Sequence, residues 1–300
     1  MKKYIVSSFV ATVFLLNGCG GSDGVRVNEH IGYYIDSGIV GVDYVCGTKQ
    51  GKTGKGGRFE FDSGKGCEFS LADIPLREVD AENLFTRVKI IEKQPEVAAF
   101  LQSLDFDGNA ANDIEISPKV VQELRSKKIQ SIPEGTALEN IIDDLKTKIG
   151  EFKGKVVTPN EAVKHLRKSQ ESLIVELLSK KTLYSVYTDE DDNTNEIVVI
   201  EKVTFNSNVT QGSSQRIKGG DDSGTFTTSI DGNKIIITDE DGTDTIVFKA
   251  YNDKYIEFYE ESEDDSDTIK LYRSKKDALE KAAQLEQSLH HQSGASGSSK

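Results

Sequence analysis

The hydrophobic pattern changes its period twice along the chain, and this constrains the fold more than any other feature. From residue 31 to 72, apolar residues alternate or form short runs between glycines, which predicts β-strands. From residue 95 to 178 they recur every three or four positions, which predicts helices, and after residue 182 alternation returns. The order predicts an α+β fold: an N-terminal disulfide-bridged β-sheet with a helical subdomain, then a C-terminal antiparallel β-meander, either barrel or sandwich.

Local signals divide the chain further. Strands are expected at 33–36, 39–46, 58–62 and 67–71, with the period changing near residue 80. Helices are expected to start at Pro95, at Ser117-Pro118 and at Thr158, where Glu161 completes a capping box, and another should cover 138–149. Seven strands are expected later, at 183–188, 196–205, 225–230, 234–238, 245–250, 255–259 and 268–272.

Domain limits follow from these patterns. We expect a β-domain with helices over 30–181 and an antiparallel β-domain over 182–274. A last helix should run over 275–289 after Ser274, and the Gly/Ser-rich end of 275–300 is expected to be disordered.

The first residues indicate export. Lys2 and Lys3 precede an apolar run from 4 to 16, which is shorter than the roughly 20 residues that span a bilayer. The next four residues, 16–19, read Leu-Asn-Gly-Cys and resemble the lipobox of bacterial lipoprotein signal peptides. The resemblance implies that residues 1–18 are a signal peptide, that Cys19 carries lipid, and that 19–29 form a flexible tether. Because Gly20 rather than Asp follows the cysteine, the resemblance implies anchoring in the outer membrane, on either of its faces.

Composition limits the partners. The chain has 37 Lys+Arg against 50 Asp+Glu, a net charge of -13. A protein this acidic is repelled by nucleic acid and by anionic lipid heads. We therefore expect no nucleic-acid partner, and contact with the membrane only through the lipid anchor.

Two cysteines remain once Cys19 is assigned to lipid. Cys46 and Cys67 would lie in an oxidising compartment, where such a pair most simply forms a disulfide. A catalytic thiol is the rival interpretation, but no His close in sequence would activate it.

Residues 36–116 carry a longer resemblance. The first half reads Asp-Ser at 36–37, Val-Gly-Val-Asp-Tyr-Val-Cys-Gly at 40–47, and Gly-Arg-Phe-Glu-Phe at 57–61. The second half ends a helix with Phe-Leu-Gln-Ser-Leu-Asp-Phe-Asp-Gly-Asn-Ala-Ala-Asn-Asp-Ile at 100–114. Together they resemble a module of proteobacterial surface lipoproteins and colonisation-factor-type proteins. This module is similar to the transthyretin-like sandwich of carboxypeptidase regulatory domains. The present chain departs from the module's motif at Asn109 and Asp113. The helix at 157–166 resembles the module's closing helix, and the C-terminal strands resemble small lipocalin-like barrels. The resemblance implies an envelope location and no enzymatic activity.

One loop suggests a cation site. Asp105, Asp107 and Asn109 stand at alternate positions, with Asp113 following, and such oxygen ligands suit Ca²⁺. The alternative is an Asx-rich turn that bonds its own backbone. This is not an EF-hand, because Gly108 is the fourth residue rather than the sixth.

No catalytic constellation is visible. The four histidines, 30, 165, 290 and 291, are not spaced as zinc ligands, and no Gly-x-Ser-x-Gly or phosphate loop occurs. Tyr255 and Tyr259 share a strand face and are candidate partner-binding residues. The favoured function is therefore a non-catalytic envelope lipoprotein that binds a protein or glycan in adhesion or assembly. The alternatives are a carrier of a small apolar ligand in the barrel and, third, a hydrolase without a recognisable motif.

Overall fold

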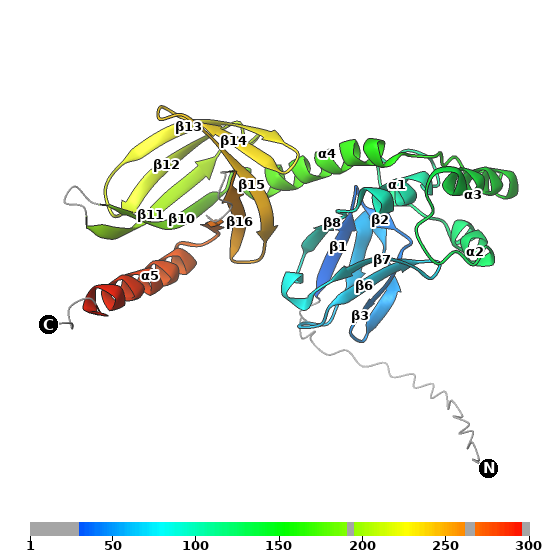
Figure 1. Cartoon of the computed structure of the whole chain (residues 1–300), viewed down its shortest axis with the longest axis horizontal. Coiled ribbons are helices and arrows are strands. Elements are labelled where there is room, and N and C mark those ends of the chain that lie inside the picture. Colours follow the sequence, from blue (N-terminus) through cyan, green and yellow to red (C-terminus); the bar gives the residue numbers. More distant parts are fainter. Residues whose placement is uncertain (1–29, 191–194, 262–267, 296–300) are drawn as a thin grey trace, which may run out of the picture.

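The computed structural model describes residues 30–190, 195–261 and 268–295. The expected signal peptide, Cys19 and tether lie outside these residues. The described chain forms two lobes, with the long helix α4 (Pro159–Leu178) passing from one to the other (Figure 1). The fold is α+β, as the sequence predicts.

The N-terminal lobe is built on two main sheets. One places β1 (Ile31–Ile35) between antiparallel β5 (Arg58–Glu60) and parallel β8 (Val88–Ile91). The other is antiparallel in the order β4 (Lys49–Lys52), β3 (Asp43–Cys46), β6 (Cys67–Leu71), β7 (Ile74–Val79). A short parallel pair joins β2 (Ile39–Val40) to β9 (Ile114–Glu115).

Aromatic side chains fill the core of this lobe. Tyr34, Phe59 and Phe69 are almost completely buried. The Phe69 ring lies 4.6 Å from the Tyr34 ring and 5.0 Å from the Phe59 ring between centroids. These three rings come from β1, β5 and β6, so they pack the two main sheets together.

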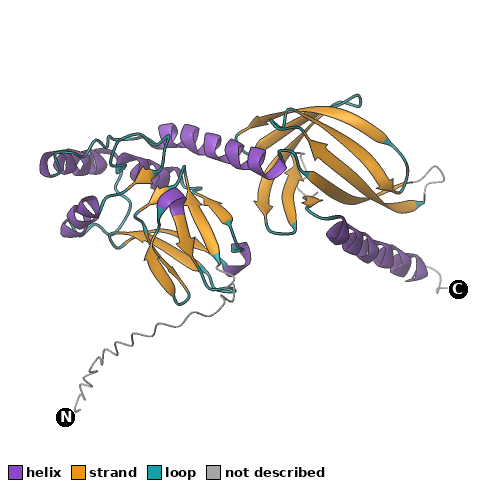
Figure 2. Ribbon diagram, turned by 180° about the vertical axis from the view of Figure 1, so that it is seen from behind, coloured by secondary structure: helices purple, strands orange, loops and turns teal. Residues whose placement is uncertain are grey.

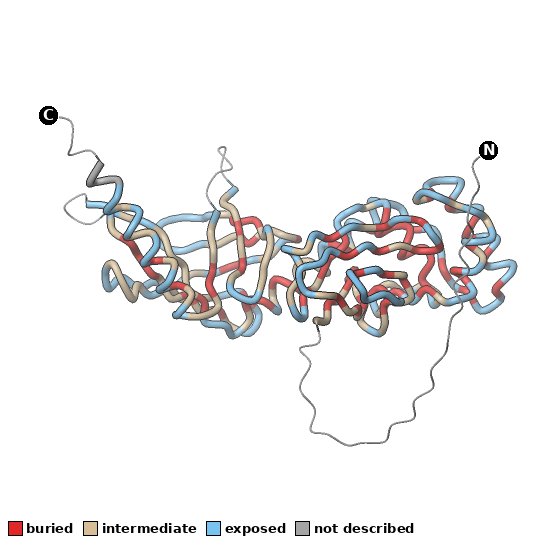
Figure 3. The backbone as a smooth tube through the Cα atoms, turned by 90° about the horizontal axis from the view of Figure 1, so that it is seen from below, coloured by how far each residue is buried: buried red, intermediate tan, exposed pale blue. Residues whose placement is uncertain are grey.

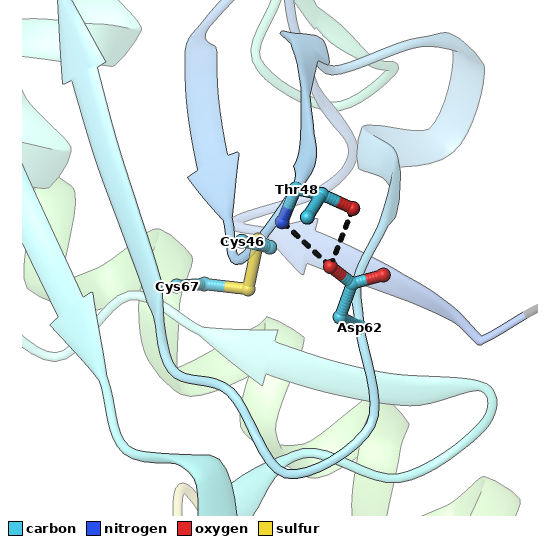
Figure 4. The surroundings of a disulfide bond; sticks show 4 residues. All are labelled: Cys46, Thr48, Asp62 and Cys67. Carbon is cyan, nitrogen blue, oxygen red and sulfur yellow. Dashed lines mark hydrogen bonds between the residues drawn. A yellow bond between two sulfur atoms is a disulfide. The ribbon is translucent and has the colours of Figure 1, made fainter.

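The disulfide expected between Cys46 and Cys67 is present, with an S–S distance of 2.02 Å (Figure 4). It joins the end of β3 to the start of β6. Beside it, the Asp62 carboxylate accepts hydrogen bonds from the Thr48 amide at 2.6 Å and the Thr48 hydroxyl at 2.7 Å. These bonds lower the pKa of Asp62 and close the turn that leads out of the bridged strand.

Helices α1 (Pro95–Ser103), α2 (Pro118–Ser126) and α4 begin at the expected start signals. Helix α3 (Gly135–Lys148) covers most of the range expected over 138–149. Ser117 caps α2, and Thr158 and Glu161 form the predicted capping box on α4. Local side-chain bonds to free amides explain this agreement, since they need no tertiary context.

The C-terminal lobe is a closed barrel of eight antiparallel strands in sequence order. This settles the choice between barrel and sandwich. The strands are β10 (Thr182–Glu190), β11 (Glu196–Phe205), β12 (Gln211–Lys218), β13 (Ser223–Asp231), β14 (Lys234–Thr238), β15 (Thr243–Tyr251), β16 (Tyr255–Glu260) and β17 (Thr268–Tyr272). β10 pairs with β17 to close the ring.

Helix α5 (Lys275–Ala295) packs on the outside of the barrel (Figure 2). Its Ala278 and Ala282 are fully buried against Val198, Ile200 and Tyr272. The helix continues past residue 289, where the sequence suggested that it would end, so part of the expected disordered tail is helical.

Five of the described strands were not predicted: β4, β7, β8, β9 and β12. β8 lies where the period was expected to turn helical, and its pairing with β1 outweighs that local tendency. β4 and β12 contain few large apolar residues, so alternation could not reveal them. Backbone pairing with β3 holds β4 in place, and backbone pairing with β11 and β13 holds β12 in place.

One hydrophobic core crosses both lobes. It includes Ala98 and Ala99 of α1, the apolar stripe of α4, and barrel residues such as Leu183 and Phe258. Figure 3 shows buried backbone in both lobes.

Candidate functional site

Asp36 is the centre of a buried polar network at the turn after β1. Its side chain is 0% exposed. Gln102 of α1 donates from Nε2 to Asp36 Oδ2 at 2.5 Å, and Nδ1 of His165 on α4 lies 2.6 Å from Oδ1. The network therefore ties together β1, α1 and α4.

His165 is held in a state that favours its charged form. The hydrogen bond to Asp36 raises the pKa of His165 most; burial lowers it, and the Asp36 charge and the Ala110 carbonyl raise it further. A charged imidazole donates from both nitrogens, which matches a carboxylate on one side and a carbonyl on the other.

Ser37 completes a Ser-His-Asp order that the sequence did not reveal. Ser37 Oγ lies 3.5 Å from His165 Nε2, and the residue has a left-handed φ of 71°. However, the Ser37 hydroxyl donates to the Ala110 carbonyl at 2.8 Å. Ser37 is therefore held by this carbonyl in the structure, and not by a short hydrogen bond to His165.

The acidic loop begins at Asp105, directly after α1. Asp105 is 0% exposed; its Oδ1 accepts from the Glu115 amide at 3.0 Å, while its buried Oδ2 has no hydrogen-bond partner. Burial raises the pKa of Asp105 to about 6; the Glu115 amide opposes the rise, and the neighbouring Asp107 carboxyl adds to it. The Asp107 carboxyl group is therefore close enough to Asp105 to act on its pKa.

Asp107 and Asn109 also bond within the loop. The Asp107 carboxylate accepts from the Asn112 side-chain amide and the Asn109 backbone amide, each at 2.9 Å, and both bonds lower the pKa of Asp107. Asn109 Oδ1 accepts from the Ala111 amide at 3.4 Å. These are the contacts of an Asx-rich turn.

Asp113 is directed elsewhere. It accepts from the Gly56 amide at 2.9 Å, joining the loop to the turn before β5. Asp107, Asp113 and Glu115 nevertheless line one surface hollow of about 670 Å³. Within the described ranges, no three His, Cys, Asp or Glu side chains are gathered as metal ligands. The structure therefore brings Asp105 and Asp107 together and leaves Asn109 and Asp113 as predicted ligands without support from contacts.

The residues that face the barrel lumen can be identified from a cluster of phenylalanines on one face of the strands. Phe205, Phe226, Phe248 and Phe258 come from four different strands and join a single apolar cluster, with the Phe205 and Phe226 rings 5.6 Å apart. Their inward direction follows because the opposite face of β10 and β11 packs on α5.

Small residues line one wall of this lumen. Val203 faces inward, and the ladder places Ser214 and then Gly224 beside it. Cross-strand partners point to the same face, so Ser214 and Gly224 also face the lumen. A Cβ built on Gly224 would meet only Ser214 Oγ, at 3.7 Å. This wall therefore has room for additional atoms.

The two ends of the barrel differ. At one end, α4 lies across the turns: the Gly232 amide donates to Glu171 at 2.9 Å and the Ser179 hydroxyl donates to the Ser207 carbonyl at 2.8 Å. In an up-and-down meander, alternate connections lie at the same end, so the other end gathers the remaining connections. Its described residues are strongly acidic: Asp189, Glu190, Asp221, Asp222, Asp239, Glu240, Asp241, Glu260 and Glu261. We call this set the acidic rim.

A polar group lies inside the lumen near the rim. Arg216 pairs with Asp189 at 2.7 Å and with Asp222 at 3.3 Å. Tyr187 lies beside it, and burial together with the charge of Glu201 raises the pKa of Tyr187. The lumen is therefore apolar near α4 and polar near the rim.

Tyr255 and Tyr259 share one face of β16, which is the outer face of the barrel, and both are partly buried. Tyr255 packs against Tyr272 at 5.9 Å and joins the cluster under α5. Lys270 Nζ lies 4.6 Å from the centre of its ring. A role for these tyrosines in partner binding stays a prediction.

None of the described helices is long and apolar enough to span a membrane. Lipidation at Cys19 concerns a residue outside the described ranges.

Sequence reasoning missed the Asp36, Gln102 and His165 network. Asp36 and His165 are 129 residues apart, and periodicity reports only local structure. One available signal was that Asp36 and His165 fall in the first and last segments of the resemblance described above.

A scan of family models, a search of curated proteins and a search of solved structures each found no match to this chain.

Proposed function

We propose that this protein is a non-catalytic lipoprotein of the bacterial cell envelope, anchored through Cys19, whose barrel binds a small, mainly apolar ligand. One observation carries the proposal: a closed eight-stranded antiparallel barrel with inward phenylalanines and a wall of small residues. Barrels of eight strands are just wide enough to hold one small ligand. This geometry favours the carrier over adhesion or assembly, for which no exposed aromatic patch was found at Tyr255 and Tyr259.

The charge distribution narrows the class of ligand. An anionic head group would meet the acidic rim, and the lumen's Arg216 is already paired with two carboxylates. Like charges repel most strongly where walls exclude water. The ligand should therefore be neutral or cationic at its polar end.

The test is to fill the lumen. Gly224→Phe adds a ring where a Cβ has only one neighbour within 4 Å, so the fold should tolerate it. We expect the neutral probe N-phenyl-1-naphthylamine to bind the wild-type chain saturably, and the variant to bind at least about tenfold more weakly. Binding is followed by probe fluorescence and melting by circular dichroism.

Gly150→Phe is the matched control, because a Cβ there has no neighbour within 4 Å and the residue lies in the N-terminal lobe. It should bind the probe as the wild type does. Equal binding by Gly224→Phe and wild type, with both folded, would place the ligand outside the barrel and overturn the proposal. Absence of saturable binding to the wild type by neutral and cationic apolar probes would also overturn it.

A further inference from the structure

Three carboxylates are almost fully buried among the described residues, and one differs from the others. Asp36, Glu92 and Asp105 are each at most 1% exposed. Asp36 is bonded at both oxygens. Glu92 accepts from the Lys93 and Gln94 amides at 2.7 and 2.8 Å, and from the Tyr34 hydroxyl. Only Asp105 keeps an oxygen without a hydrogen-bond partner.

An unpartnered buried acceptor is costly. Nearly all buried polar groups in native proteins have partners, and exceptions often mark an ion or ordered water. A second carboxyl group, that of Asp107, is close enough to raise the pKa of the first. Two ionised carboxylates accept hydrogen bonds and donate none. Their proximity is favourable only when a positive charge or a proton lies between them.

We propose that Asp105 and Asp107 bind a divalent cation of the Ca²⁺ type, with Asp105 providing its unpartnered Oδ2 from the buried side and Asp107 binding from the solvent side. This site is independent of the proposed barrel ligand. Ca²⁺ takes about six to eight oxygen ligands in irregular geometry, so loop carbonyls and water supply the rest.

The side chains that surround the pair favour this ion. Zinc prefers nitrogen and sulfur ligands, whereas carboxylate oxygens such as those of Asp105 and Asp107 suit hard cations. Two lysines lie near the Asp pair. The charge of Lys153 lowers the pKa of Asp107, and Lys55 lines the same surface hollow as Asp107. Neither ammonium group bonds to the buried Oδ2 of Asp105. This oxygen therefore remains available to a small cation.

The loop geometry holds the pair in position. The Phe106 amide donates to the Glu115 carbonyl at 2.8 Å, and the Lys153 amide donates to the Phe106 carbonyl at 2.9 Å. Gly108 has a φ of 70°, and a Cβ on it would approach the Lys153 carbonyl to 2.5 Å. The loop is thus anchored on both sides of Asp107, which reduces the ordering that ion binding requires.

The test measures thermal stability and stoichiometry with Ca²⁺ itself. The chain from residue 20 onward retains every described residue. We expect 2 mM Ca²⁺ to raise its Tm by roughly 2–4 °C, Mg²⁺ to raise it less, and calorimetric titration to give one site. Asp105→Asn with Asp107→Asn should abolish both the rise and that site. The variant should still fold, because each amide is similar in size to the carboxyl group it replaces.

The acidic rim could bind Ca²⁺ weakly, so a matched pair of substitutions is needed. Asp239 and Asp241 have the same Asp-x-Asp spacing in an exposed turn. Asp239→Asn with Asp241→Asn should keep the full rise. A rise that survives the Asp105 and Asp107 changes, or one lost equally in both pairs, would overturn the proposal. So would a wild-type Tm that Ca²⁺ does not change.

Discussion

Asp36 and His165 illustrate how single side chains organise this protein. Asp36 is buried at a strand end, and a buried carboxylate is tolerated only where donors surround it. Gln102 and His165 supply those donors from two helices. The pair therefore fixes where α1 and α4 sit on the N-terminal sheet.

Removing the imidazole should destabilise the fold. His165→Ala leaves the Asp36 charge buried with Gln102 as its main remaining donor, and breaking such a pair costs roughly 3 kcal/mol. Chemical denaturation at pH 6 would measure the loss. His30→Ala is the control, since His30 makes an exposed hydrogen bond with Thr86 and a ring contact with Phe61. Equal losses in the two variants would show that the Asp36 contact contributes nothing particular.

The same pair should make stability depend on pH. The folded-state pKa of His165 is raised, so its contribution is fully present below the unfolded-state pKa, near 6.5, and is lost as pH rises through the folded-state value. We expect His165→Gln, which keeps a neutral donor, to flatten that fall in unfolding free energy. A variant with the wild-type pH profile would contradict this.

At the residue scale, the sequence showed only what is local. The alternating oxygens of Asp105, Asp107 and Asn109 could be seen in the sequence, and their side chains do bond within one loop. That Asp105 is buried with an unpartnered oxygen could not be seen, because it depends on how the loop folds back to place the Glu115 amide on Asp105.

Elements were predictable where the signal lies in their own residues. Helices α2 and α4 begin at the expected caps because Ser117 and Thr158 bond amides within their own first turn. β12 carries no such signal; its sequence is Gln-Gly-Ser-Ser-Gln-Arg-Ile-Lys. It is a strand because both neighbours pair with it, and pairing of this kind cannot be read from one segment.

The disulfide constrains the elements around it. Cys46 and Cys67 are 21 residues apart, and a loop of this length contributes about 3 kcal/mol in the chain-entropy model. The double change Cys46→Ala with Cys67→Ala should lower the free energy of unfolding by about that amount. Reduction of the wild type should have a similar effect. Peptide mapping without reductant that found two free thiols would contradict the bridge.

At the scale of the whole molecule, we predict that the location of the protein depends on residue 19. If the segment at 16–19 is a lipobox, Cys19→Ser removes two or three acyl chains, each methylene of which contributes about 0.8 kcal/mol to membrane binding. The variant should move from the detergent phase to the aqueous phase on Triton X-114 partition. If it partitions like the parent, the anchor lies elsewhere.

Helix α4 packs against both lobes, and this limits how the barrel could be moved into another protein. The sequence suggests a cut at residue 181, between the helical and the barrel patterns. Yet Leu173, Ile174 and Leu177 of α4 belong to the same core as the barrel. That core also includes Ala162 of the same helix and two alanines of α1, Ala98 and Ala99. A fragment that starts at Thr182 would lose the helix that covers one end of the barrel. A fragment that starts at Pro159 would keep α4, but the first half of that helix would lack the α1 residues against which it packs. A transplanted barrel should therefore keep α4 together with the α1 residues that share its core.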